Sequence, residues 1–213
     1  MNDQSIIPVF PLESVLFPHV PLPLHIFEER YKKMIRRCLG EDLSFGVIFA
    51  DEDGIRETGC TAKISKITKE YQDGRMDILT IGTHRFVTQS LIDEDDYLQA
   101  EIVYFDEFEG QQEQRVRDLK IKGIDLFQEA YATTPGQIPV QDIDRVPAKF
   151  ISFFIASYAE ISMFERQSLL ELRSTKERLV REIAALERIL EESKELRTRV
   201  RRMQSNGYFK GLP

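Results

Sequence analysis

Three histidines, His19, His25 and His84, are the side chains best suited to act as general bases or metal ligands near neutral pH. His19 lies in a proline-rich segment, His25 in the alternating segment LPLHIF, and His84 directly before Arg85 and Phe86. Nucleophilic catalysis would also need a nucleophile on a sharp turn, as in G-x-S-x-G, and the sequence has no such motif. We therefore expect no catalytic residues and interpret the histidines as structural or surface side chains.

The two cysteines, Cys38 and Cys60, stand apart in the sequence and form no C-x-x-C pair. Together with three scattered histidines they do not provide the closely spaced ligands of a structural zinc site. The chain contains no Gly-Lys dipeptide, so it has no G-x-x-x-x-G-K-[ST] loop for nucleotide phosphates. We expect no metal and no cofactor, and two buried or half-buried thiols.

Charge is distributed unevenly along a chain whose net charge is -7 at pH 7. The segment from Asp93 to Glu113 has nine acidic residues and no basic ones, whereas four arginines lie between residues 197 and 202. Nucleic-acid binding needs clustered lysine and arginine, so the acidic balance argues against such a partner. No segment approaches the roughly 20 apolar residues of a membrane span, and the start MNDQS resembles no secretory signal. We expect a cytoplasmic protein without a membrane partner.

Phe17 and Phe108 are apolar side chains in segments that are hard to bury. Phe17 lies in a proline-rich loop near His19, and Phe108 lies in the acidic segment. We expect Phe17, His19 and Phe108 to contribute to an exposed patch that binds a partner. Arg85 has two interpretations, an ion pair with a carboxylate of residues 93–96 or contact with a ligand.

The stretch from Pro8 to Leu39 predicts a strand, a turn, a second strand and a helix. Proline occurs at five positions in it, and because each proline lacks a backbone donor, we expect the run to follow the edge of a sheet. An apolar stripe at helical spacing then predicts a helix that begins near Phe27 and ends at Gly40. The stripe consists of Phe27, Tyr31, Met34, Ile35 and Cys38. We expect it to lie in the core, together with Leu24.

Residues 44–105 consist largely of short apolar or alternating runs, which bring the expected number of strands to at least six. The pair Asp73-Gly74 predicts a hairpin turn between KITKEY and RMDILTI, and we expect a bulge near Lys66. Short strands separated by turns favour a closed or half-closed barrel over an open sheet.

From about residue 111 the apolar period is that of a helix. It predicts a first helix over residues 111–132 and a second, apolar on nearly all sides, that begins at Pro147. Two capping boxes, with serines at positions 162 and 174, mark the starts of two further helices. We expect the helix that begins at Pro147 to be the buried centre of a helical half.

The last predicted helix is long, because residues 174–204 contain no glycine or proline. Its first apolar seam consists of Leu179, Ile183, Leu186 and Leu190. The register then slips to a second stripe of Leu196, Val200 and Met203 among several arginines. We expect this second stripe either to contact another protein surface, such as a second copy of the chain, or to fold back on the chain's own strands.

The amino-acid sequence of these segments resembles that of the N-terminal substrate-binding domain of Lon proteases, the LON domain, over nearly the whole chain. The matching segments are PVFPL, VLFP, LPLHIFEERY, SFGVIFA, TGCTAKISKI, DGRMDILTIGTHRFVT with its Gly82, Arg85 and Phe86, YLQAEIVYF and SLLELRSTKERL. The resemblance implies an α+β fold, with a PUA-like pseudo-β-barrel over residues 1–110. A helical domain that ends in a long helix would follow over residues 111–213.

The resemblance also implies a function, the recognition of unfolded or tagged polypeptide or of a protein partner. The nucleotide-binding loop and the serine-lysine protease dyad of a complete Lon protease are missing, so we expect a non-enzymatic module. An interdomain groove is the expected binding site. Two alternatives stay open: RNA binding, because the LON barrel is similar to the PUA fold, and small-molecule binding, because a related LON domain occurs in cereblon.

Overall fold

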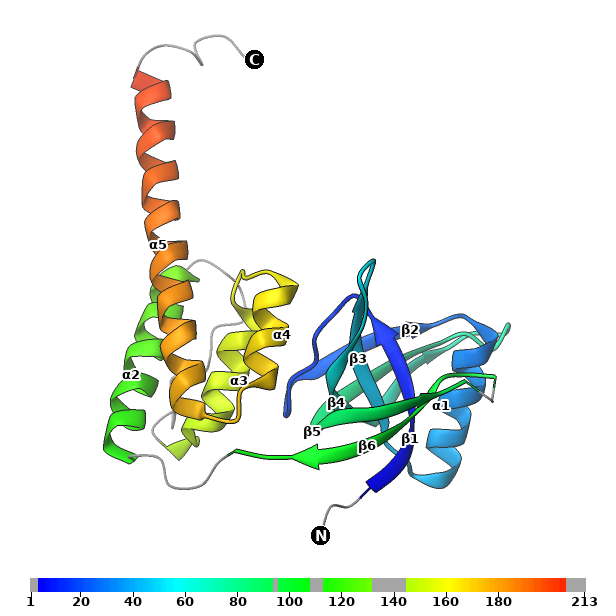
Figure 1. The fold of residues 1–213 in the computed structure, drawn as a ribbon. Coiled ribbons are helices and arrows are strands. Elements are labelled where there is room, and N and C mark those ends of the chain that lie inside the picture. The colour runs from blue at the N-terminus through cyan, green and yellow to red at the C-terminus, as the bar shows by residue number, and fades with distance from the viewer. Residues whose placement is uncertain (1–3, 94–95, 108–112, 132–144, 206–213) are drawn as a thin grey trace, which may run out of the picture.

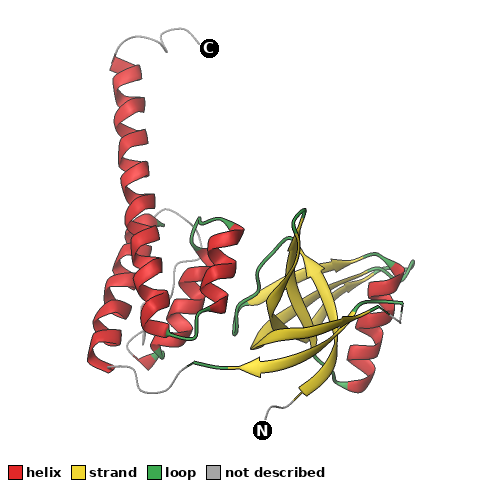
Figure 2. Cartoon of the chain, viewed as in Figure 1, coloured by secondary structure: helices red, strands yellow, loops and turns green. Residues whose placement is uncertain are grey.

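The computed structural model describes residues 4–93, 96–107, 113–131 and 145–205 (Figure 1). These residues form a strand-rich half and a helical half, which lie side by side (Figure 2). The first half contains β1 (Gln4–Leu12), β2 (Pro21–Ile26), α1 (Glu29–Glu41), β3 (Phe45–Asp51), β4 (Gly54–Glu70), β5 (Met76–Ile92) and β6 (Gln99–Phe105). The second half contains α2 (Glu113–Ala130), α3 (Ala148–Tyr158), α4 (Met163–Glu171) and α5 (Thr175–Ser205). The fold is α+β, as predicted.

The six strands of the described residues form one sheet that closes into a ring. The strand order is β2-β5-β4-β3-β1-β6, and β6 also pairs with β5. β5 is long enough to have two neighbours on one edge, because residues 76–81 pair with β2 and residues 85–92 pair with β6. The predicted barrel is therefore confirmed, and β2 is attached to β5 outside the ring.

β1 is not the edge strand that its prolines predict. Its residues 4–8 pair with β6 and its residues 9–12 pair with β3, so each half of the strand has a ladder partner on one side. Pro8 and Pro11 are tolerated because the strand changes partner between them, and a proline needs only one side of its strand to be unpaired. β2, which contains Pro21 and Pro23, does lie at the end of the strand order.

α1 packs against the sheet through most of the predicted stripe. The stripe residues from Tyr31 to Cys38 are buried among apolar side chains of β1, β3, β4 and β5, and Leu24 packs against this cluster. Phe27 does not belong to the stripe, because α1 begins after it and its side chain is 59% exposed. Gly40 does not end the helix either, since Asp42 takes the left-handed C-cap position with a φ of 52°.

Phe86 of β5 fills the inside of the ring and is fully buried. The cluster around it consists of Ile7, Val9, Ile48, Ala100 and Ile102. Gly59 of β4 makes room for the aromatic ring, because a Cβ there would lie 2.6 Å from Cζ of Phe86. The interior of the barrel is thus a packed core and not a cavity.

β4 and β5 form one long hairpin, in which each strand has 17 residues. The predicted turn at Asp73-Gly74 is confirmed, as is the irregularity near Lys66, where the register shifts. The prediction of short strands is wrong here, because RMDILTI and HRFVTQSLI are parts of a single strand, β5. This continuity lets one strand serve both β2 and the ring.

α3 lies at the centre of the helical half, as its apolar composition predicts. Ile151 and Ile155 pack with residues of α2 and α5, whereas Phe153 and Ala156 face a cluster that both halves share. The other buried members of the shared cluster are Val15, Phe17, Phe49, Leu169 and Leu170. Apolar contact is therefore continuous from the barrel into the helices.

The helix starts follow the predicted caps. Ser162 and Glu165 form a complete capping box at α4. At α5 the hydroxyl of Ser174 accepts a hydrogen bond from the N–H of Glu177 at 3.2 Å. α3 begins directly after Pro147, and α2 is slightly shorter than predicted. The predicted break over residues 133–139 lies outside the described residues.

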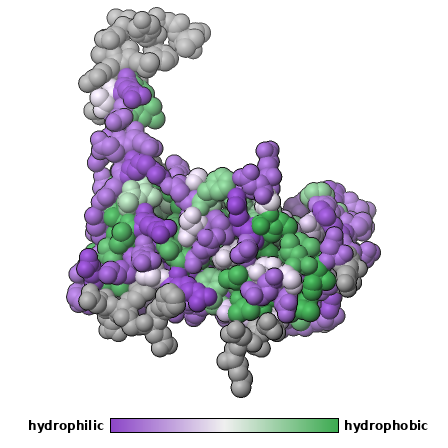
Figure 3. Space-filling model, viewed as in Figure 1, coloured by the Kyte–Doolittle hydropathy of each residue, from purple (hydrophilic) through white to green (hydrophobic). Residues whose placement is uncertain are grey.

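α5 extends well beyond the helices that it packs with. Residues 179, 183, 186 and 190, the predicted first seam, are buried, whereas residues 191–200 are all exposed. Figure 1 shows this part of the helix pointing away from both halves, and in Figure 3 its surface is mostly hydrophilic with a small hydrophobic patch near the far end. Over the residues described, the expectation that the helix folds back on the barrel is therefore wrong.

Candidate functional site

The loop between β1 and β2, residues 13–20, rests on β5 at Gly82. The N–H of His19 donates to the carbonyl of Gly82 at 2.8 Å, and the N–H of Gly82 donates to the carbonyl of Val20 at 3.0 Å. A Cβ at Gly82 would lie 2.1 Å from the carbonyl oxygen of Phe17, so only glycine permits this approach. His19 has a left-handed backbone with a φ of 64°, and its side chain is exposed. The loop thus fixes His19 beside β5.

Phe17 is buried, in contrast to the exposed position that the sequence predicts. Its side chain has no exposed area, and its ring centroid lies 6.0 Å from that of Phe153 in α3. The prediction failed because the loop is covered by the helical half, a contact that its proline content does not reveal. Phe17 therefore joins the two halves of the molecule and is closed to an external partner.

A bulge in β5 places His84 beside the same loop. The register between β4 and β5 shifts at Thr61, so that Thr83 and His84 together oppose this single residue. The hydroxyl of Thr61 accepts the N–H of His84 at 3.1 Å and lies 2.7 Å from the hydroxyl of Thr83. The pairing partner of β5 also changes at this point, from β2 to β6. His84 is exposed there, with its ring centroid 5.9 Å from that of Tyr104.

The loop, the bulge, the end of β6 and the start of α3 surround a groove of about 490 Å³. Its lining consists of Pro18, His19, Thr83, His84, Arg85, Tyr104, Phe105, Asp106, Lys149 and Phe150. Aromatic and imidazole rings dominate this lining, and the rings of His19 and Phe150 meet edge to face at 4.3 Å. Lys149 and Asp106 form an ion pair across the junction, between α3 and the residue after β6. The groove is thus mostly ring-lined, with charges that pair internally.

His19 favours the neutral imidazole. Partial burial and the nearby charges of Lys149 and His84 lower the pKa of His19 from its usual value. Within the described residues, the ring nitrogens of His19 and His84 have no hydrogen-bond partner. A neutral imidazole donates one hydrogen bond and accepts another. The His19 ring therefore offers the donor and the acceptor that a peptide bond would need, and the exposed His84 ring lies in the same groove.

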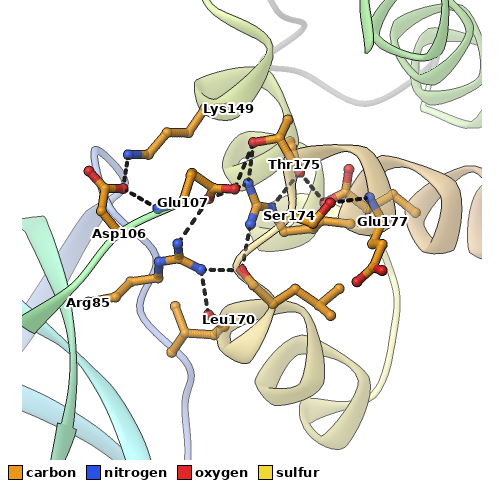
Figure 4. A network of polar contacts seen from close by, with 12 residues as sticks. Arg85, Asp106, Glu107, Lys149, Leu170, Ser174, Thr175 and Glu177 are labelled. Carbon is orange, nitrogen blue, oxygen red and sulfur yellow. Dashed lines mark hydrogen bonds and ion pairs between the residues drawn. The ribbon is translucent and has the colours of Figure 1, made fainter. Parts of the chain in front are cut away.

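Arg85 lines the groove and extends from β5 into the helical half (Figure 4). Its guanidinium pairs with Glu107 at 2.9 Å and donates to the carbonyls of Leu170, at 2.9 Å, and Leu172. Glu107 also pairs with Arg178 of α5 at 3.0 Å. The side chains of Arg85 and Arg178 are 1% and 0% exposed. Two buried cations from different halves therefore share one carboxylate. Arg85 pairs with an acidic residue, but not with one of the predicted residues 93–96.

The polar contacts continue from Arg178 into the helical core. Nε of Arg178 donates to the hydroxyl of Ser152 at 2.7 Å, and that hydroxyl donates to Oε1 of Glu182 at 2.7 Å. Oε2 of Glu182 has no hydrogen-bond partner among the residues described. Burial raises the pKa of Glu182 to about 8 and lowers that of Arg85 to about 10. Glu182 is therefore protonated at neutral pH, while Arg85 keeps its charge.

Among the residues that the structure describes, the predicted partner-binding side chains do not lie together. His19 lines the groove, and Phe108 lies outside the described residues. Leu196 and Val200 are 63% and 41% exposed on the projecting part of α5. Met203 belongs to α5, but its side chain lies outside the described part of the chain. The predicted set therefore includes one residue of the groove and two of a separate helix surface.

Sequence reasoning missed most of the groove, including Tyr104, Asp106, Lys149 and Phe150. Asp106 follows the last strand and Lys149 opens the helix after Pro147, but 43 residues separate them. His84 and Tyr104 do lie in segments that resemble the LON domain, but the resemblance assigns neither of them to a site. The rest of the lining depends on how the two halves pack, which no periodicity encodes.

The other reactive side chains of the described residues do not gather into a second site. Cys38 and Cys60 are buried free thiols, and burial raises their pKa values to about 11 and about 12. His25 pairs with Asp77 at 2.5 Å on an exposed surface. In the described ranges, no three or more His, Cys, Asp or Glu side chains cluster as a metal site would require. None of the helices described there is both long and apolar enough to cross a membrane.

A ring-shaped sheet joined to a helical bundle, with a groove at the junction, defines an α+β protein of recognisable architecture. The chain belongs to the family of the ATP-dependent protease La (LON) substrate-binding domain, whose model matches residues 6–188. It is 26% identical over 221 residues to a Lon protease of Escherichia coli K12, covering 94% of this chain and 27% of that protein. It is 24% identical over 195 residues to a Lon protease of Flavobacterium johnsoniae, covering 84% of this chain and 24% of that protein.

Two solved structures have the same fold. A Lon N-terminal domain protein from Xanthomonas campestris has a TM-score of 0.66 and 23% identity, covering 84% of this chain and 98% of that chain. The N-terminal domain of a Mycobacterium avium complex Lon protease has a TM-score of 0.70 and 17% identity, covering 86% of this chain and 98% of that chain. The expected relation to the LON domain is thus confirmed. The chain spans about a quarter of the length of the curated relatives it matches.

Proposed function

We propose that the chain is a non-enzymatic module that recognises polypeptide, and that the groove between the barrel and α3 is its binding site. The observation that carries this proposal is the family, since residues 6–188 match a substrate-binding domain. The curated relatives are Lon proteases, and the substrate of a protease is a protein chain. Polypeptide, unfolded or tagged, is therefore the ligand class.

The chemistry of the groove supports polypeptide over a polyphosphate ligand. Phosphate recognition relies on unpaired cations, but Lys149 is paired with Asp106, and Arg85 is buried against Glu107. The open surfaces are instead the rings of the lining and the imidazoles of His19 and His84. Rings can cover an apolar side chain while the imidazoles bond to the main chain, so an extended peptide suits the groove.

The absence of enzymatic activity is part of the proposal. The sequence has no phosphate-binding loop, and its family match is to a substrate-binding domain. We propose that the chain itself neither hydrolyses ATP nor cleaves peptides. Nucleotide-dependent cleavage of an unfolded protein by the purified chain would contradict this.

A second contact is proposed for the projecting part of α5, through which the chain associates with another copy. Leu196 and Val200 are exposed there on a stripe that the bundle leaves uncovered. Ile189, Ser193, Leu196 and Val200 follow the four-three spacing of a coiled-coil seam. In a parallel pair, Glu192 of one copy would lie opposite Arg197 of the other, because these positions flank the seam as g and e. The charges therefore favour a parallel arrangement.

A binding assay with a permanently unfolded protein tests the function. A reduced, alkylated and fluorescently labelled protein is titrated with the chain and compared with its native form. We expect binding of the unfolded form alone. Replacing His84 and Tyr104 together by alanine should weaken it at least about tenfold, that is by about 1.4 kcal/mol. Tyr158→Ala is the control, because Tyr158 is 46% exposed on α3 and does not line the groove.

The same titration separates the alternatives. Equal binding by the variant and the control would remove the groove from the proposal, and no binding of unfolded protein would remove the function itself. Retention on RNA or heparin at about 0.15 M salt would favour the RNA-binding alternative. A small molecule from a cell extract that the chain retains and the His84/Tyr104 variant does not would favour the small-molecule alternative.

A further inference from the structure

A second groove, of about 430 Å³, lies between α4 and α5 and shares no lining residue with the first. Its walls are two helical faces. Phe164, Ser168 and Leu169 line it from α4, and Arg181, Ala185 and Arg188 line it from α5. Positions 181, 184, 185 and 188 fall on one face of α5, since they recur at intervals of three and four. The groove therefore runs along the helices and is not a gap at one end.

The groove exists because α5 presents alanines where a larger side chain would fill it. Ala184 is exposed and Ala185 is half-buried, while Leu169 beneath them is buried. At its edge Phe164 is 55% exposed, with its ring 6.0 Å from that of Phe49. The guanidinium of Arg56 lies over the Phe164 ring, 5.3 Å from its centroid. The rest of the ring is exposed beside a floor of small residues, and together they form an apolar surface that lacks a cover.

The charges around this groove are positive on the α5 side. Arg188 forms an ion pair with Glu165 at 2.7 Å across the groove, so the charge of Arg188 is compensated within the molecule. Arg181 is exposed and has no ion-pair or hydrogen-bond partner among the residues that the structure describes. One uncompensated cation thus stands beside the apolar floor.

We propose that this groove docks a short acidic amphipathic helix of another protein. The bulky apolar residues of the helix would cover the alanine floor beside Phe164, and one of its carboxylates would pair with Arg181. The walls suit this ligand because grooves lined by helices accept apolar anchors at i, i+3, i+4 and i+7. The volume limits the contact to a few side chains, so a short segment fits better than a folded surface, which would bury roughly 800 Å² of each partner. This site is independent of the polypeptide groove.

The probes are capped, fluorescein-labelled peptides of about 14 residues, long enough to form a helix when bound. The acidic probe has leucines at i, i+3, i+4 and i+7 and glutamates elsewhere. A second probe has lysine for glutamate, and a third has serine for leucine. Fluorescence anisotropy with the full chain should show binding of the acidic probe, and at least about tenfold weaker binding of the other two.

Two variants locate the contact, and neither endangers the fold because both positions are exposed. Arg181→Glu reverses the unpaired charge, and Ala184→Gln fills the floor. Each should weaken binding of the acidic probe at least about tenfold. Arg199→Glu is the control: it makes the same charge change on the same helix, at a side chain that is 75% exposed and outside the groove.

The inference is overturned if the lysine probe binds as tightly as the acidic one, or if none of the probes binds. Equal weakening by Arg181→Glu and Arg199→Glu would also overturn it, because that result would mean general attraction to the basic face of α5. Unfolded-protein binding serves as a separate readout. If the Arg181→Glu variant binds unfolded protein as the unchanged chain does but no longer binds the acidic probe, the two grooves are distinct sites.

Discussion

Replacing Glu107 by glutamine should destabilise the protein far more than the same change at its neighbour Asp106. Glu107 is the carboxylate shared by Arg85 and Arg178, with N···O distances of 2.9 and 3.0 Å. Both guanidinium groups are essentially inaccessible to water, and the Glu107 side chain is only 15% exposed. Glutamine keeps the size and one acceptor but removes the charge, so two buried cations would face each other without compensation.

The expected loss follows from this burial. Removing one partner of a buried ion pair typically costs about 3–5 kcal/mol, because the remaining charge stays buried. Asp106→Asn breaks the ion pair with Lys149. The side chain of Asp106 is 74% exposed and that of Lys149 is 30% exposed, and exposed pairs contribute at most about 1 kcal/mol. We therefore expect Glu107→Gln to lower the free energy of unfolding by about 3–5 kcal/mol and Asp106→Asn by no more than about 1 kcal/mol.

Urea denaturation followed by circular dichroism measures both values, since urea leaves ion pairs unscreened. The same experiment tests our proposal that residues 1–110 and 111–213 are separate domains. If they are, Glu107→Gln should split the unfolding curve, because this carboxylate ties the halves together. The reasoning would be refuted if the two variants differed in stability by less than about 1 kcal/mol, since that would mean that Glu107 acts as a surface residue.

Three further results are expected. Glu182 is protonated in the folded state up to about pH 8, whereas the unfolded chain releases this proton near pH 4.5. Its contribution to stability should therefore fall as pH rises between these values, by up to about 1.4 kcal/mol per unit, and urea titrations of Glu182→Gln should lack that slope. Gly82→Ala should cost about 3 kcal/mol or more, because the new Cβ would meet the Phe17 carbonyl at 2.1 Å. Its control Gly40→Ala, with nothing within 4 Å, should be neutral or stabilising by up to about 1 kcal/mol in thermal melts. Truncation before Ser193 should leave the melting temperature unchanged within about 2 °C, since residues 191–200 are exposed, but abolish any self-association seen by sedimentation. A large loss of melting temperature would mean that this end of α5 belongs to the fold.

The sequence predicted the elements of the fold well where the signal is local. The stripe from Tyr31 to Cys38, the Asp73-Gly74 turn and the capping box at Ser162 all depend on neighbours within a few residues, and all are confirmed. Phe27 continued the same spacing by chance, because the helix begins after it and the spacing alone does not fix a helix start. The prolines of β1 misled for a similar reason, since proline excludes a ladder partner on one side only.

The site was harder to predict, because it is made by contacts between halves. Phe17 is buried by α3, which follows it by more than a hundred residues, and Arg85 finds its carboxylate at Glu107. The sequence offered an acidic partner as one of two interpretations of Arg85, the other being contact with a ligand. It could not choose which acidic residue, since that depends on where the chain leaves β6.

The Gly-x-x-Arg-Phe segment of β5 explains why loop, barrel and helices meet where they do. Gly82 has no side chain, so the 13–20 loop can lie on the strand. Arg85, three residues on, reaches the helical half and its carbonyls, while Phe86 points the opposite way into the ring. The Thr83-His84 bulge lies between them and provides the floor of the groove. Because the groove is bounded by the same residues that hold the halves together, a ligand there meets walls that the fold has already fixed. Glu107→Gln should therefore weaken peptide binding as well as stability, whereas Glu182→Gln, deep in the helical core, should affect stability alone.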